Sequence, residues 1–420
     1  MLRVVLGIAC ALVLAVLAAH PAVRRIERRL GLTVLLSSGV PFLALGVIFR
    51  LPAVGVLTDD VVADLRPALD FGLGWLGFVV GMQFDVRELD TLPEKTGAVV
   101  FIESAIPFAV AALACAGALF GLESEWSLRD ALVLGACAAP AAPVAAVALA
   151  RSSGSVSASI VARVTALNDV AGVVVLALVC AFFRPTDELS AWKLPHVAWL
   201  FVTLGMGGVL GILTYVLVRS AKGLAEEVAY LLGAVALSAG MAGYLAISPL
   251  VACAIAGALL TNLPHERMTD LRRSILQLER PLYLIFLLVA GALWDPTAWQ
   301  GWVLVPVFVL SRVSAKIVGA HVAVRAGPPE LPDARTLGLA LSPQSPIAIA
   351  TIVSFATLYG SGKSGFASTS WMMTAVIGGA VLTEIAVQAT ARLRGGLSFD
   401  VHQPSMGSIP APPMAGGPTR

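Results

Sequence analysis

Long apolar segments follow one another along almost the whole chain, separated only by short polar stretches. About thirteen of them approach or reach the roughly 17 to 25 residues that a helix needs to cross a bilayer core. They lie near residues 2–20, 32–50, 67–85, 97–120, 130–150, 157–183, 196–218, 227–246, 248–262, 275–294, 301–324, 335–359 and 370–391. Hydrophobic residues fill 58% of the 420 positions and charged residues 13%, which excludes an ordinary soluble domain. The sequence therefore predicts an all-α polytopic membrane protein.

Residues 1–394 form one predicted membrane domain, and residues 395–420 form a tail. The tail is rich in Pro, Gly and Ser, a composition typical of disorder. The first segment has a second interpretation, because Arg3 precedes an apolar run followed by small residues, as in a signal peptide. Its length and the arginine cluster that follows it favour a true membrane span.

Lys and Arg are unevenly distributed among the loops, and this bias predicts the orientation. With the amino terminus outside, the cytoplasmic loops contain Arg24, Arg25, Arg28, Arg29, Arg87, Lys95, Arg151, Arg219, Lys222, Arg267, Arg272, Arg273, Arg325 and Arg335. The opposite side contains only Arg3, Arg50, Arg66, Arg129, Arg184, Lys193 and Lys363. We therefore expect a multi-pass protein of the cell (inner) membrane, with its amino terminus outside and its carboxyl terminus cytoplasmic.

Two of the apolar segments are interrupted by a pair of prolines. The interruptions are Ala139-Pro140-Ala141-Ala142-Pro143 and Ser342-Pro343-Gln344-Ser345-Pro346. A proline inside a helix removes a backbone donor and clashes with the preceding turn. Within a membrane the freed backbone groups are tolerated only where protein or a water-filled cavity satisfies them. Interruptions at corresponding places in two halves of a chain mark the substrate site of many secondary transporters.

The predicted topology makes the two halves inverted repeats. The first six spans begin outside, and the last six begin inside, because a single seventh span separates them. The proline breaks fall in the fifth and the twelfth spans, which are equivalent positions in the two halves. We expect two discontinuous helices that cross near the middle of the bilayer, where their half-helix ends carry partial charges that need compensation.

Asp169 lies about twelve residues, or roughly 18 Å, into its span, close to the middle of a bilayer core. An ionisable group at that depth is costly, and it indicates a function by default. Asp169 follows Asn168 and precedes a wholly apolar run. The pattern favours a carboxylate that holds a proton or a cation; a buried, protonated carboxyl group with a structural role is the alternative.

Arg312 and Lys316 lie one turn apart on the eleventh span, on one helix face. Arg312 is suited to neutralise the negative ends of the broken helices, whereas a buried lysine can also give up its proton. Glu103 and Glu384 are candidates to pair with these cations or to line the cavity. Arg163, Glu279, Arg280 and His321 lie near predicted cytoplasmic helix ends, where snorkelling or a structural role is expected.

Several of these stretches resemble the monovalent cation:proton antiporter superfamily, the sodium/proton exchangers and their potassium-transporting relatives. Thr165-Ala166-Leu167-Asn168-Asp169 is similar to the Asn-Asp motif, and Arg312 with Lys316 and Gly319 resembles the basic span. The stretches 74–85, 252–257 and 342–348 resemble the third span, the ninth span and the second broken helix. The resemblance covers roughly residues 1–393, and the order of these motifs along the chain makes it specific.

The resemblance implies that Asp169 binds both the cation and the proton, that Asn168 supports it and that Lys316 is its cationic partner. It also implies a homodimer in which a core domain moves like an elevator against a dimerisation domain and so gives alternating access. We expect the partners to be H⁺, the bilayer and Na⁺, K⁺ or Li⁺, with no cofactor and no nucleic acid. Five cysteines, none in CxxC spacing, indicate neither a disulfide framework nor a zinc site.

The first break departs from the family pattern. Many members have Thr-Asp-Pro there, whereas 139–143 contains no side-chain oxygen. By analogy with other hard cations, an alkali ion needs about six oxygen ligands. The remaining candidates are Asp169, Asn168, carbonyls freed by Pro140 and Pro143, water, Ser342, Gln344 and Ser345.

The sequence therefore predicts an antiporter in which one cation and one proton compete for Asp169, with electroneutral exchange. A channel-like potassium efflux protein, an organic-anion/sodium symporter and a degenerate non-transporting membrane sensor remain as alternatives. We do not expect an enzyme, because the sequence shows no nucleophile–base pair and no cluster of metal ligands.

Overall fold

The structure is a computed structural model, and it describes residues 40–51, 55, 57–125, 127–143, 146–147, 154–184, 194–265, 267–359 and 365–393. Within these ranges the regular elements are helices, as predicted. The first half of the described chain forms α4 Val40–Arg50, α5 Asp59–Asp64, α6 Arg66–Gly81, α7 Val86–Leu89, α8 Thr96–Gly121, α9 Ser127–Ala138 and α11 Ser155–Phe182. The second half forms α12 His196–Ser220, α13 Leu224–Tyr244, α14 Pro249–Asn262, α15 Met268–Leu293, α16 Trp299–Ala326, α17 Ala334–Ala340, α18 Pro346–Tyr359 and α19 Gly365–Leu393.

The helices follow the predicted spans. Among the described residues, seven helices are long and apolar enough to cross a bilayer, and three shorter helices, α4, α14 and α18, are also apolar. The predicted span at 335–359 is divided into α17 and α18, and the span at 130–150 is interrupted after α9. The predicted span at 2–20 and the predicted tail at 395–420 lie outside the described residues. The chain is a multi-pass membrane protein.

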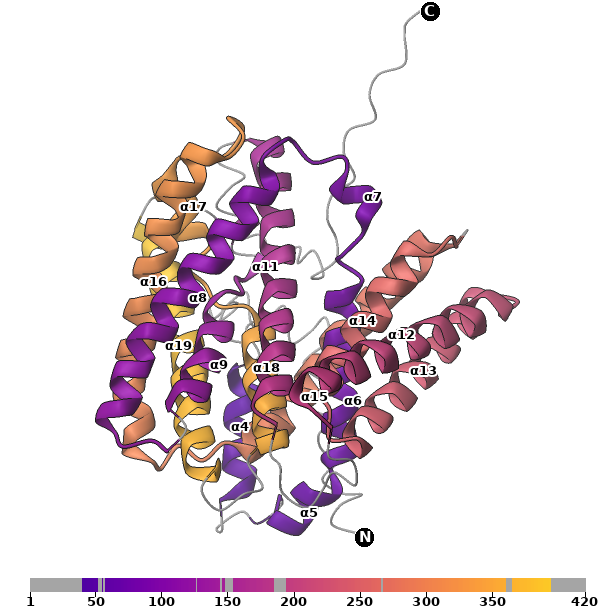
Figure 1. Cartoon of the computed structure of the whole chain (residues 1–420), viewed down its shortest axis with the longest axis horizontal. Coiled ribbons are helices and arrows are strands. Elements are labelled where there is room, and N and C mark those ends of the chain that lie inside the picture. The colour runs from indigo at the N-terminus through magenta and orange to yellow at the C-terminus, as the bar shows by residue number, and fades with distance from the viewer. Residues whose placement is uncertain are drawn as a thin grey trace, which may run out of the picture.

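The described helices form two groups (Figure 1). The break group contains both proline interruptions and consists of α8, α9, α11, α16, α17, α18 and α19, which pack on one another. The flank group consists of α4, α6, α12, α13, α14 and α15. From the break group, α11 packs against α6, α12 and α14, and α18 packs against α6 and α14. These two helices form much of the boundary between the groups.

Two helix pairs of the flank group are related by the predicted inverted repeat. Helix α4 packs against α15, and α6 packs against α14. The first pair joins the second span to the tenth, and the second pair joins the third span to the ninth. In the repeat the second span corresponds to the ninth and the third to the tenth, so exchanging the two halves converts one pair into the other. Gly46 lies against the backbone of α15, and Gly257 lies against the backbone of α6 at Phe78. Both pairs therefore use the close backbone approach that small residues permit between membrane helices.

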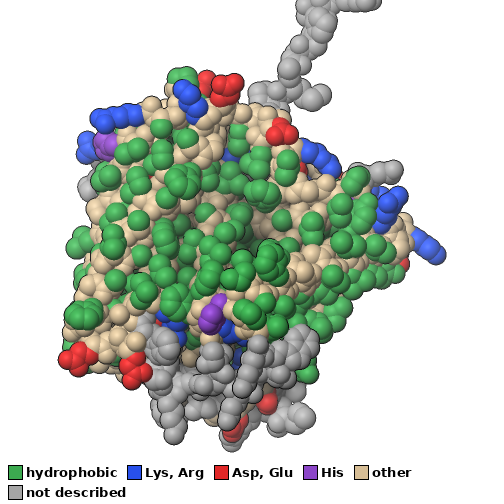
Figure 2. Space-filling model, viewed as in Figure 1, with side chains coloured by type: hydrophobic (Ala, Val, Ile, Leu, Met, Phe, Trp, Pro, Cys, Tyr) green, Lys and Arg blue, Asp and Glu red, His purple; other side chains and the backbone are tan. Residues whose placement is uncertain are grey.

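The surface of the helices fits a lipid environment. Large apolar side chains are exposed on α8 and α12, including Phe101, Leu113, Phe120, Phe201 and Val209. Figure 2 shows that apolar side chains cover the middle of one face, while charged side chains gather at its upper and lower edges and at its right-hand tip. An apolar band between charged edges is the pattern expected of a bilayer-spanning protein.

We predict that Gly257→Val disrupts the pair of α6 and α14. A Cβ at this position meets the Phe78 carbonyl oxygen and lies 3.2 Å from the Met82 nitrogen, and backbone atoms cannot move aside as a side-chain tip can. Such overpacking costs about 1–3 kcal/mol or more. Thermal unfolding and size-exclusion chromatography of purified protein measure the effect. Gly208→Val on α12 is the control, because a Cβ there meets nothing within 4 Å; equal melting temperatures of the two variants would contradict the prediction.

Candidate ion-binding site

The two proline breaks touch each other inside the break group. Ala141 and Gln344 form an antiparallel bridge, and the Ala142 N–H donates to the Pro343 carbonyl oxygen over 2.9 Å. Ala141 is fully buried, and Gln344 is 6% exposed. Pro346 begins α18, the position where a proline costs a helix no hydrogen bond. The predicted crossing of two discontinuous helices is therefore confirmed.

Arg312 of α16 holds the crossing together. Its guanidinium group donates to the carbonyl oxygens of Ala138, Pro140 and Pro343 over 3.1, 2.7 and 3.3 Å, and also to that of Ser342. These carbonyls lie at or just beyond the C-terminal ends of α9 and α17, where helix dipoles place partial negative charge. Arg312 is fully buried. One planar cation thus satisfies backbone acceptors from both breaks.

Lys316, one turn further along α16, lies beside the first break. Its ammonium group donates to the carbonyl oxygens of Ala139 and Glu103, both over 2.8 Å. It also forms an ion pair with the Glu103 carboxylate, with 3.8 Å between Nζ and Oε2. Both side chains are fully buried. Gly319 makes room for this carboxylate, because a Cβ there would lie only 3.1 Å from Glu103 Oε1.

Asp169 and Asn168 lie on α11 next to the crossing, and both are fully buried. Asn168 accepts a hydrogen bond from Ser104 of α8 over 2.8 Å. Gly172, one turn beyond Asp169, lets α11 approach the first break, since a Cβ there would lie 2.7 Å from Pro140 Cγ. The side chain of Ser345 lies beside the Asp169 carboxyl group, and Lys316 and Arg312 are close enough to interact with it electrostatically.

Several buried polar atoms near the crossing have no hydrogen-bond partner among the described residues. They are both carboxyl oxygens of Asp169, the amide nitrogen of Asn168, and the amide oxygen and nitrogen of Gln344. Buried polar groups are nearly always hydrogen-bonded, so unpaired groups call for an explanation. Buried oxygens of this kind can hold a proton or a cation.

The other predicted oxygen ligands are already engaged. The Ser342 hydroxyl donates to the Gly338 carbonyl oxygen over 2.7 Å, and Ser345 Oγ accepts from the Ile347 N–H over 3.2 Å at the start of α18. The carbonyls of 138–140 and of 342–343 accept hydrogen bonds from Arg312 or Lys316. A metal cation beside these carbonyls would face a fixed positive charge. The first break therefore offers a cation fewer free carbonyl oxygens than its two prolines predict.

Glu279 of α15 is a residue that the sequence interpretation undervalued. It is only 5% exposed, and it lies close enough to Asp169 for the two carboxyl groups to interact electrostatically. Glu384 is half-buried on α19 and interacts electrostatically with Tyr283 of α15, while Lys316 pairs with Glu103. The only signal for Glu279 in the sequence was its place two turns inside a helix, which tells nothing about its neighbour.

Comparison with known proteins agrees with this geometry. The sequence matches the family model described as sodium/hydrogen exchanger, transmembrane, over residues 8–391. The chain belongs to this family. Among solved structures, the exchanger resembles the sodium proton antiporter MjNhaP1 from Methanocaldococcus jannaschii, with a TM-score of 0.58 and 15% sequence identity. The similarity covers 93% of this chain and 96% of the other, and at this identity it establishes the fold. No curated protein matches the sequence significantly.

Family membership makes cation/proton antiport the activity class of the exchanger. A monovalent cation and a proton are its transported substrates, and the resemblance noted in the sequence is confirmed at the level of the superfamily.

We predict that Arg312→Lys destabilises the exchanger by about 2–4 kcal/mol, because a lysine cannot reproduce the planar set of donors and leaves buried carbonyls unpaired. Thermal unfolding in detergent measures the loss. Arg325→Lys, an exposed position near the end of the same helix, is the matched control. If both variants melt at the temperature of the unmodified protein, Arg312 does not hold the crossing.

Proposed function

We propose that the protein is a secondary active antiporter that exchanges Na⁺ or K⁺ for H⁺, with Asp169 as the site that both share. The observation that carries the proposal is a fully buried carboxyl group next to the crossing, whose two oxygens accept no hydrogen bond from the described residues. A carboxylate buried without partners is costly. Either a proton or a cation removes that cost, and one carboxylate cannot bind both tightly at the same time.

The proton carrier in this proposal is Asp169 alone. Lys316 is bound to two backbone carbonyls and paired with Glu103, so its charge is compensated within the break group. This arrangement supports a lysine that keeps its proton while Asp169 changes occupancy. One cation then exchanges for one proton, and the exchange is electroneutral.

The cation ligands in this proposal are mainly side-chain oxygens and water. Asp169 supplies the charge, and Ser345, Gln344 and Asn168 lie on the elements around it. A site with few protein oxygens leaves the ion partly hydrated, which favours weak discrimination between Na⁺ and K⁺.

Alternating access is proposed to come from movement of the break group against the flank group. Asp169 lies on α11, which borders the flank group, and both groups have their own internal packing. Such a movement carries the site across the membrane while the crossing keeps its contacts.

We further propose that residues 1–394 act as one transporter domain. This domain functions as a homodimer in the inner membrane, with a cytoplasmic carboxyl terminus.

Asp169→Asn is expected to abolish cation-driven proton movement in proteoliposomes that contain a pH dye, because an amide does not take up and release a proton and supplies no negative charge to the cation. Asp270→Asn on α15 is the matched control, since that side chain is 61% exposed and is not part of the candidate site. Additions of Na⁺, K⁺, Li⁺ and Rb⁺ in turn measure selectivity. Unchanged exchange in Asp169→Asn liposomes would refute the assignment.

Competition at one carboxylate also predicts the pH dependence. Once protons occupy most of the sites, the apparent KM for the cation should rise about tenfold for each unit by which pH falls, with an unchanged maximal rate. Clamping the membrane potential should leave the rate unaltered. A potassium channel would instead pass current without proton movement, and a symporter would take up a labelled organic anion.

A further inference from the structure

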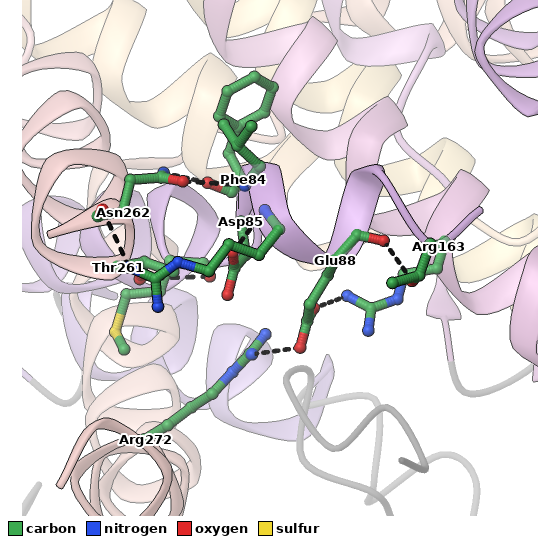
Figure 3. Close-up of polar contacts among 11 residues, drawn as sticks. Phe84, Asp85, Glu88, Arg163, Thr261, Asn262 and Arg272 are labelled. Atoms are coloured by element: carbon green, nitrogen blue, oxygen red, sulfur yellow. Dashed lines mark hydrogen bonds and ion pairs between the residues drawn. The ribbon is translucent and has the colours of Figure 1, made fainter. Parts of the chain in front are cut away.

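Helix α7 lies on the segment that joins the two helix groups, between α6 of the flank group and α8 of the break group. Its residue Glu88 is placed between two arginines (Figure 3). One carboxylate oxygen pairs with Arg163 of α11, and the other lies 3.3 Å from Arg272 of α15. A single side chain thus joins a helix of the break group to a helix of the flank group.

The two arginines would repel each other without this carboxylate. Arg163 and Arg272 are close enough for their charges to interact, and Asp85 adds a second negative charge facing both. The side chains of Arg163 and Arg272 are 12% and 18% exposed, so solvent screens the pairs only in part. Removal of the Glu88 charge therefore leaves the two arginines with Asp85 as their nearby negative charge and weakens the attraction between the groups.

The segment around α7 is hydrogen-bonded to the flank group. Asn262, at the end of α14, accepts from the Val86 N–H over 2.9 Å and donates to the Phe84 carbonyl oxygen over 2.7 Å. Arg87 donates to the Asn262 carbonyl oxygen over 3.3 Å. Because Glu88 is held on this side, its pair with Arg163 is an ion pair that crosses the boundary.

Helix α11 is also held at its other end. Arg184 donates to the carbonyl oxygens of Leu245 and Ala246 over 2.8 and 3.0 Å, and it stacks 3.4 Å from the ring centroid of Trp199. These partners belong to α12 and to the connection between α13 and α14. Both ends of α11 are therefore tied to the flank group in a conformation that buries Asp169 completely.

We propose that Glu88 is an electrostatic latch that ties α11 to the flank group and that its pair with Arg163 must open in each transport cycle. The inference rests on the proposed exchange, because it assigns the latch to the movement that carries Asp169. Arg163, Ala166 and Asp169 are spaced three residues apart, so each is a neighbour of the next on the helix surface, and opening at Arg163 admits water toward the carboxyl group.

The first test measures water access without measuring transport. Ala166 is 5% exposed, so Ala166→Cys, in a background whose five native cysteines are replaced by alanine, reports opening through its rate of reaction with a water-soluble maleimide. Glu88→Gln should raise that rate about three- to tenfold. Glu94→Gln removes an exposed carboxylate of the same segment and should leave the rate unchanged. Equal rates in the two variants would overturn the latch.

The second test locks the pair. Glu88→Cys with Arg163→Cys, joined by a bis-methanethiosulfonate reagent with a spacer, should exchange at less than a tenth of its unlinked rate, and dithiothreitol should restore the exchange. Glu88→Cys with Thr91→Cys places both thiols in the α7 segment, and joining them should have no effect. Full exchange by the protein cross-linked between residues 88 and 163 would refute the latch and leave the proposed function standing. A lack of exchange by the unmodified protein would refute the proposed function. The maleimide labelling test would then still decide whether Glu88 holds the two groups together.

Discussion

The bonds from Arg312 to the carbonyl oxygens of the two proline breaks are the interaction on which the rest of the site depends. Each break exposes backbone acceptors that lipid cannot satisfy. A guanidinium group satisfies several of them at once in a single plane. With the breaks fixed, α11 can pack on Pro140 through Gly172, and Asp169 then faces the second break at Ser345.

The fold could be predicted from the sequence to a large extent because the bilayer imposes the length and polarity of each span. The positions of both breaks, the depth of Asp169 and the basic face of α16 are all local properties of the chain, and the structure places them together. Local patterns could not predict which helices belong to which group, since packing between spans depends on small residues whose partners are far away in sequence.

Pairing between ionisable residues was the part that local patterns could not decide. Glu103 and Glu384 were equal candidates for Lys316, and the choice of Glu103 follows from the packing of α8 against α16 at Gly319. Glu279 and Arg163 both lie near predicted helix ends, where snorkelling is the usual explanation. Their neighbours, Asp169 for one and Glu88 for the other, come from different helices. Sequence position gives depth in the membrane but not direction around the helix axis.

The charge count of the crossing has a consequence for leakage. With Asp169 and Glu103 ionised, the four charges of Asp169, Glu103, Arg312 and Lys316 sum to zero, and a bound proton or alkali ion raises the sum to one in either case. In the proposed exchange the two loaded forms therefore carry equal charge, and the membrane voltage would not distinguish them. The empty form is distinguished by its bare carboxylate, which must remain desolvated while the groups move. The desolvation of these two oxygens, which have no hydrogen-bond donor among the described residues, would keep the proposed carrier from returning empty and so keep the two ion flows coupled.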